Sequence, residues 1–543
     1  MTKRRSGLLV TCVVLVASVT SAAPSVAAPK ATHRIILGVR AGVDASALIR
    51  SVGGTVTYRY RTIDAVAASV PDGARQQLRH ADGVRFAQRD IVRHLDGIVS
   101  PTEPYLGSPE FIPWGVRDVG ATEVWDANGN GHIDAGAPAG HGVTVAVIDN
   151  GADFGHPDIG PAYDRSLSAC FIAPGCSPVD DIAGEDQGHG VAAASVIAAP
   201  INDVGVVGVA PRATIVSYRA GDSSTGTLAD SAILAALDRA ITDRVDVINM
   251  SFGGHSSSPA ERWMLAEADA RGIVAVASAG NGDDHSGGKP PVQSPARLPT
   301  VIGVGATDSH RALADFSSFG HGLDLVAPGV AVPMDGVRGA SVDSGLTIGG
   351  TNPPSIGNLP FEFSPTGSVT GRLRAIGLGT TADVAGVDLT GKIALIERGT
   401  ITFAEKVANA AEAGAAAAII FNNQPGTISG TLGSLGAIPT IEISAADGAL
   451  LQGRLANGAV SASVRVASTD YVDWDGTSFS APHVVGVVAL LLSVNPSLSP
   501  AGVRRALDST ATDLGRAGYD KRFGYGLVNA CAAVSAVGGD CAG

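Results

Sequence analysis

The chain has 543 residues, of which 45% are hydrophobic, and its formal net charge is −13. This length exceeds that of one compact domain and predicts about three or four. The acidic balance argues against a general binder of nucleic acid or of anionic membranes, because both need a basic surface.

The first 28 residues have the pattern of a secretory signal peptide: a basic start, an apolar run from Leu8 to Val19, and small residues up to Ala28. A transmembrane anchor is the alternative, but the apolar run is short for a span. The second apolar run, VVGVVALLLSV at 484–494, is also short and is expected to be a buried helix. We therefore expect a secreted, extracellular protein with no membrane attachment once the signal is removed.

Strand and helix patterns alternate over residues 30–95, and a proline-rich linker follows at 100–113. From residue 143 the chain shows six apolar runs, several of them separated by helical segments: VTVAVID, TIVSYRA, VDVINM, IVAVAS, TVIGVGAT and LDLVAPG. Continuous apolar strands are typical of a parallel α/β sheet covered on both faces. Functional residues of such a sheet gather at the carboxyl ends of its strands.

The stretch DGTSFSAPHVVG, 475–486, surrounds Ser478 with small residues. Gly476 permits close backbone approach and Pro482 is tolerated near a helix start, so Ser478 is expected at a loop-to-helix junction. The N–H groups of a helix N-terminus suit an oxyanion forming beside a nucleophile. An ordinary capping serine is the alternative.

A serine nucleophile needs a histidine base and a carboxylate that orients it. Two GHG tripeptides offer His141 and His189. His141 precedes the strand that Asp149 closes, which separates the two by about 26 Å, so His189 is the candidate base. Asn281, in ASAGN just past a buried strand, is the candidate oxyanion donor, although an Asn after Gly is also a common turn residue.

These segments resemble the subtilisin-like serine proteases, because VAVIDNG, GHG, INMSFGG, ASAGN and GTSFSAPHVVG occur in the family's order. The resemblance implies a subtilisin-like parallel sheet flanked by helices. It also implies Asp149 as orienter, His189 as base, Ser478 as nucleophile and Asn281 as oxyanion donor, in an enzyme whose chemistry requires no cofactor. The peptide-binding cleft would be lined by Ser251, Phe252, Gly253 and Gly254, with Gln293 near the pocket floor.

The resemblance extends over nearly the whole chain. It implies a signal peptide at 1–28, a small α+β inhibitor-like prosegment at 29–100, a catalytic domain at 101–337 and 468–543, and a β-rich protease-associated (PA) insert at 338–467. The PA match rests on DLTGKIALIERG and FAEKVANAAEAGA. The expected partners are protein or peptide substrates and the chain's own prosegment, which would block the cleft of a monomeric enzyme until it is cleaved.

Three residues depart from the family pattern. Asn150 stands where Ser or Thr is usual, and Val191 and Ala192 replace the usual Thr-His. None of them removes a catalytic group, but they change the support around the triad. A catalytically inactive binding protein that acts through the PA insert is therefore the alternative function. A lipase-type esterase is disfavoured, because its elbow reads G-x-S-x-G rather than G-T-S-F-S.

Two further features concern stability. The four cysteines outside the signal form two close pairs, which predict disulfides Cys170–Cys176 and Cys531–Cys541 in an exported protein, and their spacings do not resemble a zinc site. The segment DANGNGHID resembles the start of a calcium loop, although Ala137 stands at the position of the bidentate Glu. A structural calcium ion and a plain Asn-Gly turn both stay open there, and the candidate ligands are Asp126, Asn128, Asn130 and Asp134.

Overall fold

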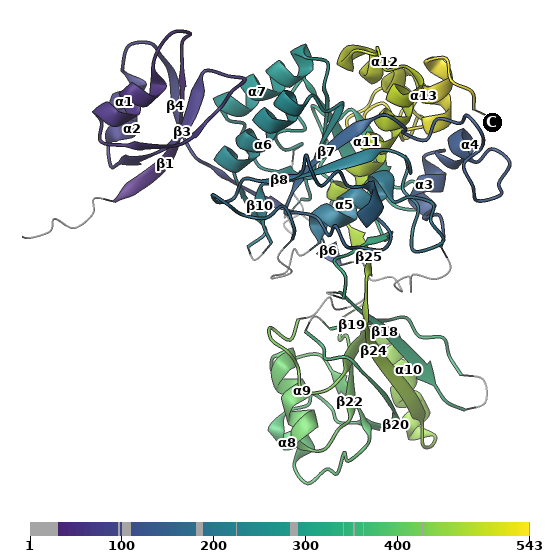
Figure 1. The fold of residues 1–543 in the computed structure, drawn as a ribbon. Helices are drawn as coiled ribbons and strands as arrows, with labels where there is room; N and C mark the ends of the chain where they lie inside the picture. The colour runs from purple at the N-terminus through teal and green to yellow at the C-terminus, as the bar shows by residue number, and fades with distance from the viewer. Residues whose placement is uncertain are drawn as a thin grey trace, which may run out of the picture.

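The computed structural model describes residues 31–541 except 96–97, 100–109, 181–187, 224, 283–290, 340, 351–352, 362, 425–427 and 429–430. The predicted signal peptide lies outside the described residues. Figure 1 shows a small N-terminal body, a central α/β body and a β-rich body formed by the insert.

The central body is built on a seven-stranded sheet in the order β16-β15-β14-β12-β7-β9-β8, in which every neighbouring pair is parallel. This confirms the predicted α/β class, and all six predicted apolar strands belong to this sheet. The strands are β7 (Thr144–Asp149), β8 (Ala169–Cys170), β9 (Thr214–Arg219), β12 (Val247–Met250), β14 (Val274–Ser278), β15 (Val301–Thr307) and β16 (Leu325–Pro328). The helices of this body are α3 (Trp114–Asp118), α4 (Thr122–Trp125), α5 (His189–Ala198), α6 (Asp230–Asp243), α7 (Pro259–Ala270), α11 (Thr477–Val494), α12 (Pro500–Thr510) and α13 (Ala530–Ala536).

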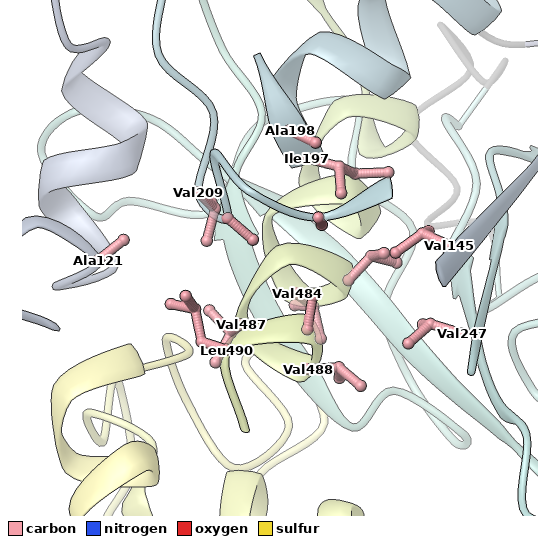
Figure 2. Packing of buried hydrophobic residues seen from close by; sticks show 14 of the residues in the cluster. Ala121, Val145, Ile197, Ala198, Val209, Val247, Val484, Val487, Val488 and Leu490 are labelled. Atoms are coloured by element: carbon pink, nitrogen blue, oxygen red, sulfur yellow. The ribbon is translucent and has the colours of Figure 1, made fainter. Parts of the chain in front are cut away.

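The core of the central body forms around helix α11. Figure 2 shows Val484, Val487 and Leu490 of this helix among apolar side chains of α5 and of the central strands. A helix that is apolar on all sides must be buried, and α11 is long and apolar enough to cross a membrane, yet 89% of it lies inside the protein. The expectation of a buried helix after Ser478 is confirmed.

The N-terminal body is a four-stranded antiparallel sheet, in the order β2-β3-β1-β4, with two short helices. Its elements are β1 (Thr32–Val39), α1 (Ala45–Ser51), β2 (Thr55–Arg59), β3 (Ala65–Pro71), α2 (Ala74–Arg79) and β4 (Val84–Arg89). Alternate strand residues such as Ile35, Leu37 and Val66 form a separate apolar core with α1 and α2. This body has the small α+β fold expected of the segment.

The insert has its own seven-stranded sheet, in the order β18-β24-β20-β21-β22-β23-β19. Its strands are β18 (Ser341–Ile348), β19 (Asn358–Pro360), β20 (Gly367–Ala375), β21 (Ile393–Glu397), β22 (Ala417–Phe421), β23 (Thr440–Ile443) and β24 (Ser461–Thr469), and its helices are α8 (Thr381–Val384), α9 (Phe403–Glu412) and α10 (Ala445–Ala456). The chain leaves the central body through β17 (Val332–Asp335) and returns through β25 (Tyr471–Asp475), and these two strands pair antiparallel. The insert is therefore attached at one narrow neck (Figure 1).

Both disulfides have the expected pairing. Cys170 and Cys176 are joined with their Cα atoms 5.6 Å apart, and Cys531 and Cys541 with theirs 5.4 Å apart. Each bridge closes a short loop, so each adds at most about 3 kcal/mol to the free energy of unfolding.

Candidate active site

The aspartate and the histidine singled out from the sequence lie in direct contact. Asp149 ends strand β7 and His189 begins helix α5, and the Nδ1 atom of His189 lies 2.9 Å from one carboxylate oxygen of Asp149 and 3.0 Å from the other. Both side chains are 1% exposed. Because a carboxylate only accepts hydrogen bonds, Nδ1 carries the donated proton and Nε2 is the basic nitrogen of the ring.

The backbone on both sides of His189 is held by side chains. The N–H of Gly188 donates to Asp180 at 2.7 Å, and the N–H of Gly190 donates to the side-chain oxygen of Asn150 at 2.9 Å. Gly188 has a φ of 80°, which a glycine adopts without strain. Asn150 thus ties the residue after Asp149 to the residue after His189, which gives this departure from the family pattern a physical role.

Val191 and Ala192, the other two departures, are fully buried in helix α5. Val191 belongs to the main apolar core, and Ala192 packs in a smaller cluster with Trp474 and Phe479. They contribute apolar side chains to the core in the first turn of the helix that begins with His189.

Ser478 lies in the first turn of helix α11, at the predicted loop-to-helix junction. Its Oγ donates to the carbonyl of Ser251 at 3.1 Å, and the hydroxyl of Ser251 donates back to the carbonyl of Ser478 at 2.6 Å. The second bond forms because Pro482, four residues later, has no N–H to give that carbonyl. The ring of His189 lies against the same turn, with its centroid 5.3 Å from that of Phe479.

Asn281 is oriented by the residue before Ser478. Its side-chain oxygen accepts from the N–H of Thr477 at 2.9 Å and from the Thr477 hydroxyl at 2.8 Å. A backbone N–H can only donate, so the oxygen faces Thr477 and the amide nitrogen occupies the other end of the group. Thr477 was not among the residues predicted from the sequence, although a hydroxyl residue next to the candidate nucleophile is a readable signal.

A second histidine, His483, lies on the same helix as Ser478, but unlike His189 it is bonded to a backbone carbonyl and not to a carboxylate. It is completely buried, and its Nδ1–H donates to the carbonyl of Phe479 at 2.8 Å. Burial lowers the pKa of His483 to about 4, although the bond to Phe479 acts in the opposite direction. His483 is therefore neutral at physiological pH and is not poised to exchange protons there.

The predicted cleft holds a segment of the same chain. Strand β5 (Val92–Leu95) lies between β11 (Thr227–Ala229) and β13 (Phe252–Gly253) and runs antiparallel to both. Phe252 is paired with Leu95, and Gly253 with His94. Beyond Leu95, the short strand β6 (Ile98–Val99) pairs with β25, which leads directly to Ser478.

The predicted calcium loop is closed by hydrogen bonds from the chain itself. Asp126 accepts from the N–H groups of Asn130 and Gly131, both at 2.9 Å, and Asp134 accepts from the N–H of Ala127 and from the side chain of Asn128. Among the residues that the structure describes, no group of three or more His, Cys, Asp or Glu side chains is placed to hold a metal ion. Asn side chains are not among these groups, so the structure does not test calcium at this loop, and a calcium ion there stays a prediction.

A parallel α/β sheet that sets an Asp–His pair at its carboxyl edge, beside a serine on the first turn of the core helix, has the arrangement of a serine peptidase. The chain matches the model of the subtilase family over residues 140–357 and that of the PA domain over 366–451. It is 34% identical to subtilisin amylosacchariticus from Bacillus subtilis subsp. amylosacchariticus over 285 residues, which are 52% of this chain and 67% of that protein. The chain belongs to the subtilase family and is a subtilisin-like serine peptidase.

Two other relatives cover more of the chain. The minor extracellular protease Vpr of Bacillus subtilis is 27% identical over 455 residues, which are 73% of this chain and 50% of that protein. The crystal structure of the psychrophilic subtilisin-like protease Apa1, from Pseudoalteromonas sp. AS-11, is similar with a TM-score of 0.53 and 29% identity, covering 80% of this chain and 99% of that one.

Proposed function

We propose that this peptidase is a secreted endopeptidase in which Ser478 attacks the substrate carbonyl and forms an acyl-enzyme. His189 takes the serine proton at Nε2 and passes it to the leaving amine, and Asp149 holds the ring in the tautomer this requires. The observation that carries the proposal is the 2.9 Å Asp149–His189 contact beside the first turn of α11. The Ser478 hydroxyl, which donates to Ser251, must turn toward His189 before the proton moves.

Asn281 and the N–H of Ser478 supply the oxyanion site in this proposal. Thr477 engages the oxygen end of the Asn281 amide, which fixes the direction of the NH₂ end. In the proposed mechanism this end donates to the reacting carbonyl once a substrate is bound. N–H groups in the first turn of a helix have no acceptor within the helix, so that of Ser478 suits a negative oxygen. After the amine departs, water attacks the acyl group and His189 serves again as base.

A fluorophosphonate probe tests the mechanism, because it reacts only with an activated serine. We expect labelling at Ser478, located by peptide mass spectrometry, together with cleavage of a peptide library by the same preparation. A folded protein that takes no label would be a binding protein on the subtilase fold, which is the alternative function.

Export to the extracellular space is part of the proposal. It is supported by the signal-like residues 1–28 and by two disulfides, which persist in oxidising compartments. A relative that spans 73% of this chain is named an extracellular protease.

We further propose that residues 29–100 act as a prosegment that assists folding and inhibits the enzyme. Asp90 accepts from the backbone N–H of Ser231 at 2.8 Å and so caps helix α6, while the Gln88 oxygen accepts from the N–H of Ala260 at 3.1 Å and caps α7. The N-terminal body thus binds the starts of two helices of the central body, and strand β5, which follows it in the chain, fills the predicted cleft.

The two strand pairings predict where maturation cuts the chain. Leu95 pairs with Phe252, and Ile98 pairs with Asp475, which lies three residues before Ser478. The scissile bond is therefore expected between Leu95 and Ile98, slightly before the predicted domain boundary at residue 100. N-terminal sequencing of the secreted enzyme should therefore start at Asp96, Gly97 or Ile98. A different N-terminus would mean either that this segment does not follow the path of a substrate or that the enzyme is trimmed after the first cut. A time course of N-terminal sequencing distinguishes the two, because trimming would show the expected N-terminus first.

The PA insert is expected to affect the choice of large substrates and not the chemistry, because the proposed triad lies outside it. Gly336 donates to the carbonyl of Asp470 at 2.7 Å across the neck, so residues 340–469 can be replaced by a short glycine linker. The shortened enzyme should hydrolyse small peptides at nearly the parental kcat/KM but cleave folded proteins at altered rates. Loss of peptide hydrolysis in a variant that circular dichroism shows to be folded would place the insert in the active site.

A further inference from the structure

One arginine is buried where the chain occupies the cleft. Exposure alternates along β5: Val92 is 55% exposed, His94 is exposed, and Arg93 between them is 1% exposed. Arginine is almost never fully buried unless its charge is paired. The side chain of Arg93 therefore marks a pocket that was built to receive a guanidinium group.

The pocket pairs that group with a carboxylate and two carbonyls. Glu261, also 1% exposed, lies 2.5 Å from a terminal nitrogen of Arg93. The other terminal nitrogen donates to the carbonyl of Ser256 at 2.8 Å and to that of Ser294 at 3.3 Å. All three groups belong to the central body, whereas the arginine belongs to the proposed prosegment.

Glu261 is fixed in place independently of the arginine. Its backbone N–H donates to Ser258, the N-cap of helix α7, at 3.0 Å, and its second carboxylate oxygen accepts from the Ser294 hydroxyl at 3.0 Å. Burial raises the pKa of Glu261, and Arg93 acts against that rise by stabilising the ionised form. When β5 leaves the cleft, the pocket retains a preorganised carboxylate without its cation.

We infer that Glu261, with the carbonyls of Ser256 and Ser294, forms a substrate subsite that selects peptides with an arginine at the position of Arg93. This inference rests on the proposed function, because it takes the path of β5 as the path of a substrate. The selected residue lies two positions before the residue that pairs with Phe252. Arginine suits the pocket better than lysine, since its planar group reaches the carboxylate and both carbonyls at once.

A peptide series on the wild-type enzyme tests the subsite. The parent peptide is the chain's own segment DIVRHLDGIV, residues 90–99, flanked by a fluorophore and a quencher. Replacing its arginine with glutamine should lower kcat/KM by at least about thirtyfold, the effect of losing one partner of a buried ion pair, and lysine should fall between the two. The matched control replaces the adjacent exposed histidine with alanine and should change kcat/KM by less than about threefold.

An enzyme variant completes the test. In Glu261→Gln the preference for arginine over glutamine should fall to within about threefold. Glu267→Gln changes a half-buried glutamate of the same helix, which is paired with Arg271, and should keep the full preference. If Glu261→Gln does not fold, the peptide series on the wild type decides alone. Equal hydrolysis of the arginine and glutamine peptides, or a preference that survives in folded Glu261→Gln, would overturn the subsite only. No hydrolysis of unfolded casein or of any peptide would overturn the proposed function and the subsite with it.

Discussion

Ser478→Ala should yield a folded precursor that keeps its prosegment and hydrolyses no peptide. The substitution removes one oxygen at the start of a buried helix, so it should cost little stability. In the proposed mechanism the same oxygen forms the covalent bond to the substrate. We expect kcat to fall by about a millionfold, a figure borrowed from the nucleophile of subtilisin itself.

The measurement is the N-terminal sequence and the peptidase activity of the secreted variant, with circular dichroism to verify folding. Ser480→Ala is the matched control, because Ser480 is buried in the same turn and its hydroxyl has no hydrogen-bond partner among the described residues. The control should mature normally. Normal maturation of Ser478→Ala would mean either that another protease removes the prosegment or that Ser478 is not the nucleophile, and phosphonate labelling of the wild type separates these two cases.

His189→Ala extends this prediction to the base. The nucleophile and its base act as a unit, so the single variant should lose activity to a similar degree, and the double variant with Ser478→Ala should be little worse than either. Losses that added up in the double variant would contradict a shared proton transfer.

Asn281→Ala should lower kcat by about a hundredfold to a thousandfold and leave KM nearly unchanged, a range measured for the corresponding donor in subtilisin. The reason is that the negative oxygen exists only along the reaction path, so its donor stabilises the transition state more than the bound substrate. Steady-state kinetics on one peptide measures both constants. An effect confined to KM would make Asn281 a binding residue.

Thr477→Val tests the orientation of the Asn281 amide while keeping Asn281 itself. It removes the hydroxyl that donates to Asn281 at 2.8 Å but keeps the backbone N–H that donates at 2.9 Å. We therefore expect a smaller fall in kcat than in Asn281→Ala. A loss as large as that of Asn281→Ala would show that the orientation of the amide, and not only its presence, limits the rate.

The amino-acid sequence by itself determined the elements that depend on local pattern. Continuous apolar runs predicted six of the seven strands of the central sheet, because a strand covered on both faces has no polar side; the two-residue strand β8 is too short to give such a run. The helix after Ser478 and both disulfides could also be predicted, because apolar composition and close cysteine spacing are local properties of the sequence. The positions of Asp149, His189 and Asn281 at strand ends and a helix start followed from these elements.

The tertiary structure alone decided which distant groups meet. Asn150 and Gly190 are 40 residues apart, Thr477 and Asn281 are 196 apart, and Arg93 and Glu261 are 168 apart. No periodicity links such pairs, because their contact depends on how whole elements pack. Nothing in the local sequence singles out Glu261, which lies in the first turn of α7, a place where carboxylates are common. The packing of β5 against β13 brings the buried Arg93 to it, and this contact is the observation from which the subsite is inferred.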